Sequence, residues 1–267
     1  MRNTTATATK RLRSALPPLA VALLIIGVWY AISYLVLDPA RRFLMPPPHT
    51  VLVDSFGDAA VRDAIGSALW QTTQVAFSGL GAAIVLGVLW AITMNHASWL
   101  ERSLFPYAVM LQCIPVLALV PLIGFWFGFD FFARVVVCVL VALFPMVSNT
   151  LFGLRSVDRA QRELFALQRA SWWVVLIRLE LRAALPAIFA GMRISAGLAV
   201  VGAIVADFFF RQGEPGIGAL ISSYQARAQS AELFATILVA ALLGVAVFVA
   251  FGRLTRRCVG HWHASTR

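Results

Sequence analysis

The sequence predicts an all-α, polytopic membrane protein with six transmembrane helices. Hydrophobic residues make up 60% of the 267 residues and charged residues only 13%, which is roughly half the charged share of an ordinary soluble domain. The mean hydropathy is +0.83. Apolar runs of about 20 residues recur along the chain, and a helix of that length crosses the roughly 30 Å hydrocarbon layer of a bilayer. Composition and run length therefore exclude a soluble globular domain.

The apolar runs define the six predicted spans. They are residues 18–37, 69–92, 104–127, 131–154, 187–210 and 233–252. The first run is too long for the apolar part of a signal peptide and no small-residue cleavage site follows it, so we interpret it as a retained span. Residues 1–17 and 255–267 are then terminal tails, and residues 18–254 form one transmembrane domain. The Pro-rich and then weakly amphipathic residues 38–68 predict a turn and a short surface helix.

The distribution of basic residues predicts which side each loop faces. With the N-terminus inside, six of the 22 Lys and Arg residues fall on the outer side, and all the others fall on the cytoplasmic side. The outer six are Arg41, Arg42, Arg62, Arg134, Arg211 and Arg227. Cytoplasmic loops of membrane proteins are enriched in Lys and Arg, so we expect both termini in the cytoplasm. The net charge of +10 then needs no nucleic acid to explain it, and no basic, aromatic-lined motif for nucleic acid is present.

Two spans carry small residues at every fourth position. In the second span these are Gly79, Ala83, Gly87 and Ala91, and in the fifth they are Gly191, Ser195, Ala199 and Ala203. Small side chains at this spacing let helix backbones approach closely in lipid. We interpret them as packing inside one bundle, and a contact between subunits is the alternative.

Prolines and one acidic residue are the candidates for the translocation path. Pro115, Pro121 and Pro145 interrupt the third and fourth spans, and a proline inside a helix tends to kink it. Asp207 lies near the outer end of the fifth span, where we expect contact with water, and a charge within a span is a functional candidate. It either pairs with a neighbouring helix or lies near the transport path. Pro115, Pro121 and Asp207 are therefore assigned to translocation or gating.

Residues 155–186, between the fourth and fifth spans, are rich in charge and must lie in water or against protein. The stretch "DRAQRELFALQ" predicts a short helix that brings Leu164, Phe165 and Leu167 together, beside polar Glu163. Arg169 and Ala170 suit a turn, and Ser171 is a candidate N-cap for the helix that follows. Pro186 fits the first turn of the fifth span. So much apolar surface on a loop indicates that it docks a partner or packs under the bundle.

No catalytic or metal-binding constellation is visible in the sequence. The Zn-protease, serine-hydrolase and phosphate-loop motifs are absent. The three cysteines, Cys113, Cys138 and Cys258, have neither disulfide nor zinc spacing. The sequence thus predicts a transport subunit that is not itself an enzyme and binds no metal or cofactor.

Several segments resemble ATP-binding-cassette (ABC) importer permeases. Glu163, Ala170-Ser171, Leu185-Pro186 and Gly191-Met192-Arg193 resemble the "EAA" loop of that family. The segments "FLMPPPHTV", "YAVMLQCIPVLALVPLIGFWFGFD", "ALFPMVSNTLFGLRSVD" and "VADFFFRQGEPGIGALI" resemble other parts of its pattern. Leu164 and Phe165 replace two alanines of the family pattern, and Arg169 replaces its loop glycine. The resemblance covers about residues 18–255 and is nearest to the nitrate, sulfonate and taurine group, with its thiamine-precursor and riboflavin relatives.

The resemblance implies a type I ABC importer permease in the cell membrane, in contact with its lipids. It also implies a second permease copy, two ATPase subunits that carry ATP and Mg, and a solute-binding protein on the outer side. The resemblance and the apolar helix face together give the predicted ATPase-coupling residues. These are Glu163, Leu164, Phe165, Leu167, Arg169, Ala170 and Ser171. The substrate is a small organic solute or an anion, and the charges of the outer loops roughly cancel, so they do not distinguish the two.

Two other functional classes predict features that this sequence does not show. An ion-coupled secondary transporter predicts inverted repeats and several carboxylates within the spans, and the sequence shows neither. A membrane-embedded enzyme predicts clustered His, Asp, Glu or Ser residues at the span ends, which are also not evident.

Overall fold

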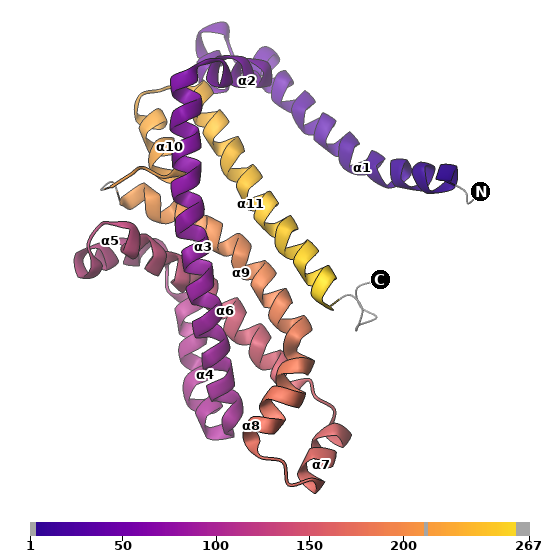
Figure 1. The fold of residues 1–267 in the computed structure, drawn as a ribbon. Coiled ribbons are helices and arrows are strands. Elements are labelled where there is room, and N and C mark those ends of the chain that lie inside the picture. Colours follow the sequence, from indigo (N-terminus) through magenta and orange to yellow (C-terminus); the bar gives the residue numbers. More distant parts are fainter. Residues whose placement is uncertain (1–3, 211–212, 260–267) are drawn as a thin grey trace. The chain divides into compact units, whose positions relative to one another are not determined.

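The computed structural model describes residues 4–210 and 213–259, which are almost entirely helical and contain no strand (Figure 1). The helices, in chain order, are α1 (Thr4–Ala31), η1 (Ile32–Val36), η2 (Pro39–Leu44), α2 (Pro48–Gly57), α3 (Ala59–His96), α4 (Ser98–Cys113), α5 (Val116–Phe127), α6 (Phe131–Arg155), α7 (Arg159–Leu167), α8 (Trp172–Val175), η3 (Leu176–Glu180), α9 (Leu181–Phe209), α10 (Ile217–Ala226) and α11 (Ser230–Val259). The prediction of an all-α fold is confirmed.

The predicted membrane spans have clear counterparts. Five helical segments are long and apolar enough to cross a membrane: Leu16–Val36, Ala59–His96, Phe131–Arg155, Trp172–Phe209 and Ser230–Cys258. The helices α4 and α5 form a sixth when the bent pair counts as one span. The pair is bent by 100°, so the third span, predicted to be kinked by proline, is an elbow. Pro115 is the N-cap residue of α5 and lies at this break, whereas α5 and α6 continue through Pro121 and Pro145.

Residues 1–64 and 223–237 form one compact unit. The end of the first span is fixed within it by Trp29, which donates its indole N–H to the carbonyl of Pro46 at 3.0 Å. The same indole ring packs against Phe234, with 5.4 Å between the ring centroids. The turn and surface helix predicted after the first span correspond to η2 and α2.

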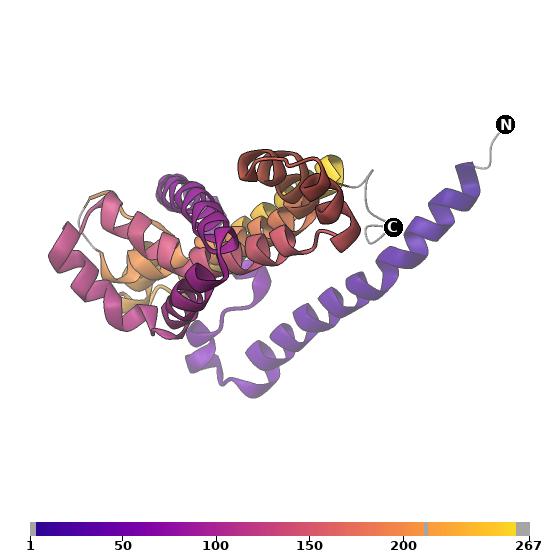
Figure 2. The same ribbon diagram turned by 90° about the horizontal axis from the view of Figure 1, so that it is seen from below.

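Residues 65–222 and 238–267 form the second unit. Its centre is the pair α6 and α9, which lie side by side and are crossed by α3 (Figures 1 and 2). Helix α6 contributes to all three buried clusters of this unit. The apolar side chains of α6 therefore pack against protein on several sides of the helix.

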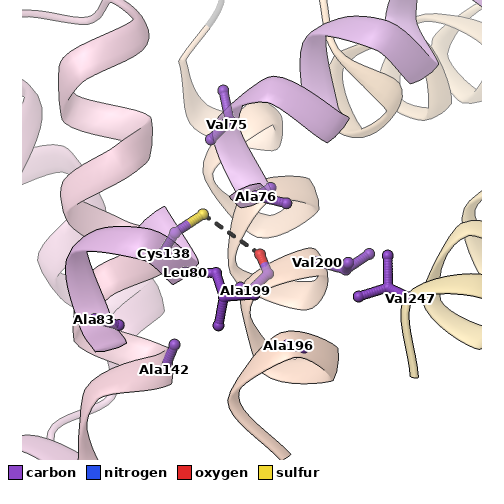
Figure 3. Close-up of a cluster of buried hydrophobic side chains, with 11 residues drawn as sticks. Val75, Ala76, Leu80, Ala83, Cys138, Ala142, Ala196, Ala199, Val200 and Val247 are labelled. Carbon is purple, nitrogen blue, oxygen red and sulfur yellow. Dashed lines mark hydrogen bonds between the residues drawn. The ribbon is translucent and has the colours of Figure 1, made fainter. Parts of the chain in front are cut away.

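Small residues allow the close approach of these helices (Figure 3). Cys138 of α6 lies against α9 and donates its thiol hydrogen to the carbonyl of Ala199 at 3.4 Å. Ser195 of α9 donates to the carbonyl of Ala142 at 2.7 Å, and a Cβ atom at Gly87 of α3 would lie only 2.6 Å from that of Met146. Both small-residue stripes thus pack inside this unit, as the sequence analysis preferred.

The contact of Gly87 leads to a stability prediction. Gly87→Ala should destabilise the permease by about 1–3 kcal/mol, because the added methyl group overpacks α3 against α6. Gly81→Ala is the matched control on the same helix, since a Cβ there meets no atom within 4 Å. Thermal unfolding of the detergent-solubilised variants measures the difference. Equal unfolding temperatures for the two variants would contradict this packing.

Candidate functional site

The short helix α7 presents apolar side chains at the end of the second unit. Asp158 is its N-cap residue and accepts a hydrogen bond from the backbone N–H of Ala160 at 3.2 Å, which satisfies one of the free donors at a helix start. Leu164 is 54% exposed and Leu167 is 83% exposed, whereas Phe165 is half-buried. The predicted apolar face therefore exists, and Leu167 is its most prominent residue.

The turn after α7 keeps a glycine-type geometry without a glycine. Arg169 has a φ of 51°, in the left-handed region that favours glycine. Its N–H donates to the carbonyl of Ala166 at 2.9 Å, and the N–H of Ala170 donates to the carbonyl of Phe165 at 3.1 Å. These two bonds are the Schellman pattern that ends many helices. The arginine thus occupies the left-handed position that the family pattern gives to glycine.

The segment after this turn differs from the prediction. Ser171 is the N-cap residue of α8, as predicted, but its side chain makes no capping hydrogen bond. The chain is then helical without interruption from Trp172 to Phe209, through the π-helical segment η3. Pro186 lies inside α9 rather than in its first turn. The helix that follows Ser171 therefore runs into the fifth span without a break.

A polar network joins α7 to the helices above it. Arg162 makes an ion pair with Glu180 of η3 at 2.8 Å and donates to the carbonyl of Leu154, in the last turn of α6, at 3.0 Å. Asn95, near the end of α3, donates to the second carboxylate oxygen of Glu180 at 2.7 Å. Glu180 is buried, so this carboxylate is compensated by partners from two sides. One buried acid therefore links α3, α6, α7 and the start of α9.

Glu163 is not part of this network. It is exposed and pairs with Arg159 one helical turn earlier, at 2.8 Å. An exposed pair of this type stabilises a helix by only about 0.3–0.5 kcal/mol. Glu163 is therefore accessible to a partner, and the fold of this unit does not depend on it.

A cavity of about 460 Å³ lies at the α4–α5 elbow. It is lined by Leu111, Gln112, Val116, Leu140, Val141, Phe144, Pro145, Ser148, Asn149, Ile194 and Leu198. Gln112 lies in the last turn of α4 and Val116 begins α5, so the bend itself forms one wall. Pro115 lies at this bend but is not a lining residue of the cavity, and the same is true of Pro121 and Asp207.

The polar side chains of the cavity indicate whether this face of the unit lies against lipid, water or protein. Gln112 is exposed, Ser148 and Asn149 are partly exposed, and all three lie within segments apolar enough to cross a membrane. Polar groups within such segments are unfavourable against lipid and are found facing a water-filled path or protein. The cavity face is therefore suited to a translocation path or a subunit contact.

Asp207 lies in a second polar network, at the other end of α9. Its carboxylate is fully buried, forms an ion pair with Arg134 of α6 at 3.2 Å and accepts a hydrogen bond from Thr72 of α3 at 2.9 Å. Arg134 also donates to the carbonyls of Phe210 and Glu214. Asp207 is thus a partner for neighbouring helices, and the expected contact with water is wrong for this structure.

The glycines after Asp207 explain why the chain can fold closely over it. A Cβ atom at Gly216 would collide with the carboxylate, and one at Gly218 would lie 2.8 Å from the Cβ of Asp207. The N–H of Ile217, between them, donates to the hydroxyl of Thr72 at 2.8 Å. The pattern "GEPGIG" therefore lets the start of α10 close over the buried ion pair.

Sequence reasoning found the α7 face but missed the partners of both networks. Arg134 was counted as an outer arginine and Glu180 as a loop charge. The signal available was their position close to apolar runs, where a charge must find a partner. Which partner it finds depends on contacts between distant residues, and no local pattern gives these.

Comparison with known proteins agrees with this geometry. Residues 83–259 match the family model described as the binding-protein-dependent transport system inner membrane component. The formylaminopyrimidine transport permease protein of Halalkalibacterium halodurans is 31% identical over 245 residues, covering 92% of this chain and 95% of the relative. The riboflavin transport system permease protein of Chloroflexus aurantiacus is 32% identical, covering 84% and 82%. The taurine transport system permease protein of Escherichia coli is 26% identical, covering 91% and 88%.

A solved structure shares the fold. The crystal structure described as an amino acid ABC transporter with histidines superposes with a TM-score of 0.60 at 16% identity, covering 76% of this chain and 96% of that one. The chain is a multi-pass membrane protein and a transport component rather than an enzyme. It belongs to the inner-membrane components of binding-protein-dependent transport systems and is the permease subunit of an ABC importer.

Proposed function

We propose that α7 is the surface by which this permease docks its ATPase. The observation that carries the proposal is the exposure of Leu164 and Leu167 on a helix fixed at the end of the unit. Apolar side chains exposed on a rigid helix are typical of an anchor that a partner buries. Phe165 and Glu163 extend this face, and the turn from Arg169 to Ser171 holds it in place.

The network of Arg162 and Glu180 connects the proposed docking helix to the spans. A displacement of α7 by the ATPase acts on Glu180, and through it on the ends of α3 and α6 and on the start of α9. A buried ion pair has a restricted geometry, because separating it leaves an uncompensated charge. We therefore assign Arg162 and Glu180 to the transmission of ATPase movement, as positioning residues.

The cavity at the α4–α5 elbow is the proposed translocation path. In this proposal a second permease copy faces it and closes it from lipid, and two ATPases, which carry ATP and Mg, dock on the side that α7 faces. In this proposal α7 and both termini face the cytoplasm, which fits the excess of basic residues on that side. A solute-binding protein acts on the outer side. Pro115 lies at the bend and permits it, and Pro121 and Asp207 are assigned to gating through the helices that hold them.

The docking proposal predicts that Leu167→Ala weakens ATPase binding about 10- to 100-fold, because a buried leucine contributes roughly 1.5–3 kcal/mol. Phe165→Ala should weaken it less, since this ring is already half-buried. Leu35→Ala is the matched control, since Leu35 of the first span is 84% exposed but lies outside α7. Glu163→Ala should lower transport-coupled ATP hydrolysis without lowering membrane insertion.

The measurement is retention of the ATPase on the detergent-solubilised permease, with the mass of the wild-type complex giving its copy number. The proposal expects two permease chains and two ATPases in one particle. If Leu167→Ala retains the ATPase as well as Leu35→Ala does, α7 is not the docking surface. A particle with one permease chain per two ATPases would exclude the homodimer.

A further inference from the structure

We propose that the cavity at the α4–α5 elbow passes an uncharged organic solute with an apolar body and a hydrogen-bonding edge, rather than an organic or inorganic anion. This inference rests on the translocation role proposed above and narrows the substrate class. It is carried by the chemistry of the lining and by the orientation of the charged groups nearest to it.

The residues that line the cavity are all uncharged. Most are aliphatic, Phe144 adds an aromatic ring, and only Gln112, Ser148 and Asn149 are polar. Small-molecule sites typically combine such an apolar wall with a few polar groups that orient the ligand. Pores for anions instead carry Arg or Lys rings that replace the hydration lost by the ion.

Two polar lining residues each use one donor within the protein. Ser148 donates its hydroxyl hydrogen to the carbonyl of Pro145 at 3.4 Å, and Asn149 donates an amide hydrogen to the same carbonyl at 2.8 Å. The oxygens of both side chains are left as acceptors. The second amide N–H of Asn149 and the amide of Gln112 can still donate. The polar edge therefore offers both acceptors and donors, which a neutral heterocycle matches on both counts and an anion, which only accepts, does not.

The charged groups closest in sequence to the lining are engaged elsewhere. Arg193 precedes the lining residue Ile194, but its guanidinium lies over the ring of Phe248 on α11, 4.0 Å from the centroid. Arg134 and Asp207 neutralise each other at the end of α9. A second copy of this chain would add the same uncharged lining. An anion in the cavity would therefore lose hydration without gaining a cation, which is unfavourable in an apolar medium.

The test uses the complete importer, with its own binding protein and ATPase, in proteoliposomes. The probes are labelled riboflavin and formylaminopyrimidine as neutral solutes, and an aliphatic sulfonate and bicarbonate as anions. We expect ATP-dependent uptake of a neutral heterocycle, and Ser148→Lys should lower it about tenfold or more, because the solute would then have to pass a desolvated ammonium group. Ser98→Lys makes the same change at the exposed start of α4, outside the cavity, and should leave uptake unchanged.

The outcomes separate the inference from the proposed function. ATP-dependent uptake of the aliphatic sulfonate or of bicarbonate that Ser148→Lys leaves unchanged or increases would overturn the substrate class and leave the permease role intact. If none of the four probes is taken up, the proposed substrate class is overturned, and so is the assignment of the cavity as the translocation path. The docking proposal would fall separately, through ATPase retention by the Leu167→Ala variant.

Discussion

Asp207→Asn should unfold at a clearly lower temperature than the wild-type permease. The substitution keeps the size of the side chain but removes the charge that compensates Arg134, whose side chain is only 4% exposed. Removing one partner of a buried ion pair costs about 3–5 kcal/mol. With the scaling that holds for soluble domains of 150–250 residues, this corresponds to a fall of about 6–20 °C.

The expected loss has a structural reason beyond the pair itself. Arg134 also holds the carbonyls of Phe210 and Glu214, so a displaced guanidinium frees the end of α9 and the loop that follows it. Thr72 binds both Asp207 and the first N–H of α10. The network therefore fastens four helices at one point, and its loss is expected to act on all of them.

Thermal unfolding of the detergent-solubilised permease, followed by tryptophan fluorescence, measures this effect. Asp54→Asn is the control, because Asp54 is an exposed acid on α2. The unfolding temperature of Arg134→Lys should lie between those of Asp207→Asn and the wild type. This substitution keeps the charge but loses the forked geometry of the guanidinium. If Asp207→Asn and Asp54→Asn unfold at the same temperature, the ion pair contributes nothing to the stability of the fold.

These residues also show how far the sequence alone leads. The spans, α2, α7 and the turn at Arg169 were predictable because each rests on a local pattern: an apolar run, an amphipathic period or a helix stop. The small-residue stripes also gave the correct faces of α3 and α9, since spacing alone determines which side of a helix they share.

The rest depends on contacts that span long stretches of sequence. The pairing of Asp207 with Thr72 joins residues 135 positions apart, and that of Glu180 with Asn95 joins residues 85 apart. The 100° elbow needed more than Pro115, since α5 and α6 pass through Pro121 and Pro145 without a break. A proline permits a bend, and the packing around it determines whether the bend occurs. The sequence therefore names candidates for bends and pairs, but it does not select among them.

Glu180→Gln should separate ATPase binding from ATPase coupling. The variant leaves Leu164 and Leu167 exposed on α7, so retention of the ATPase should stay within about twofold of the wild type, a difference of roughly 0.4 kcal/mol. It removes the charge that holds Arg162, and a charge-assisted hydrogen bond contributes about 1.5–3 kcal/mol. Solute-stimulated ATP hydrolysis should then fall about tenfold or more, because movement of α7 no longer reaches α3 and α9.

Glu101→Gln is the matched control for this experiment. It breaks a second ion pair, to Arg155, which joins α4 to the end of α6 without contacting α7. A merely structural role for Glu180 would lower its unfolding temperature and its hydrolysis together, and Arg162→Lys would then give no recovery relative to Arg162→Ala. A role in transmission instead predicts a fall in unfolding temperature no larger than the loss of this one contact explains, together with normal ATPase retention and lost stimulation. Stimulation should recover partly in Arg162→Lys, because the charge remains. If Glu180→Gln hydrolyses ATP in response to solute as well as Glu101→Gln does, the movement of α7 reaches the spans by another route, and the docking face of α7 is unaffected by that result.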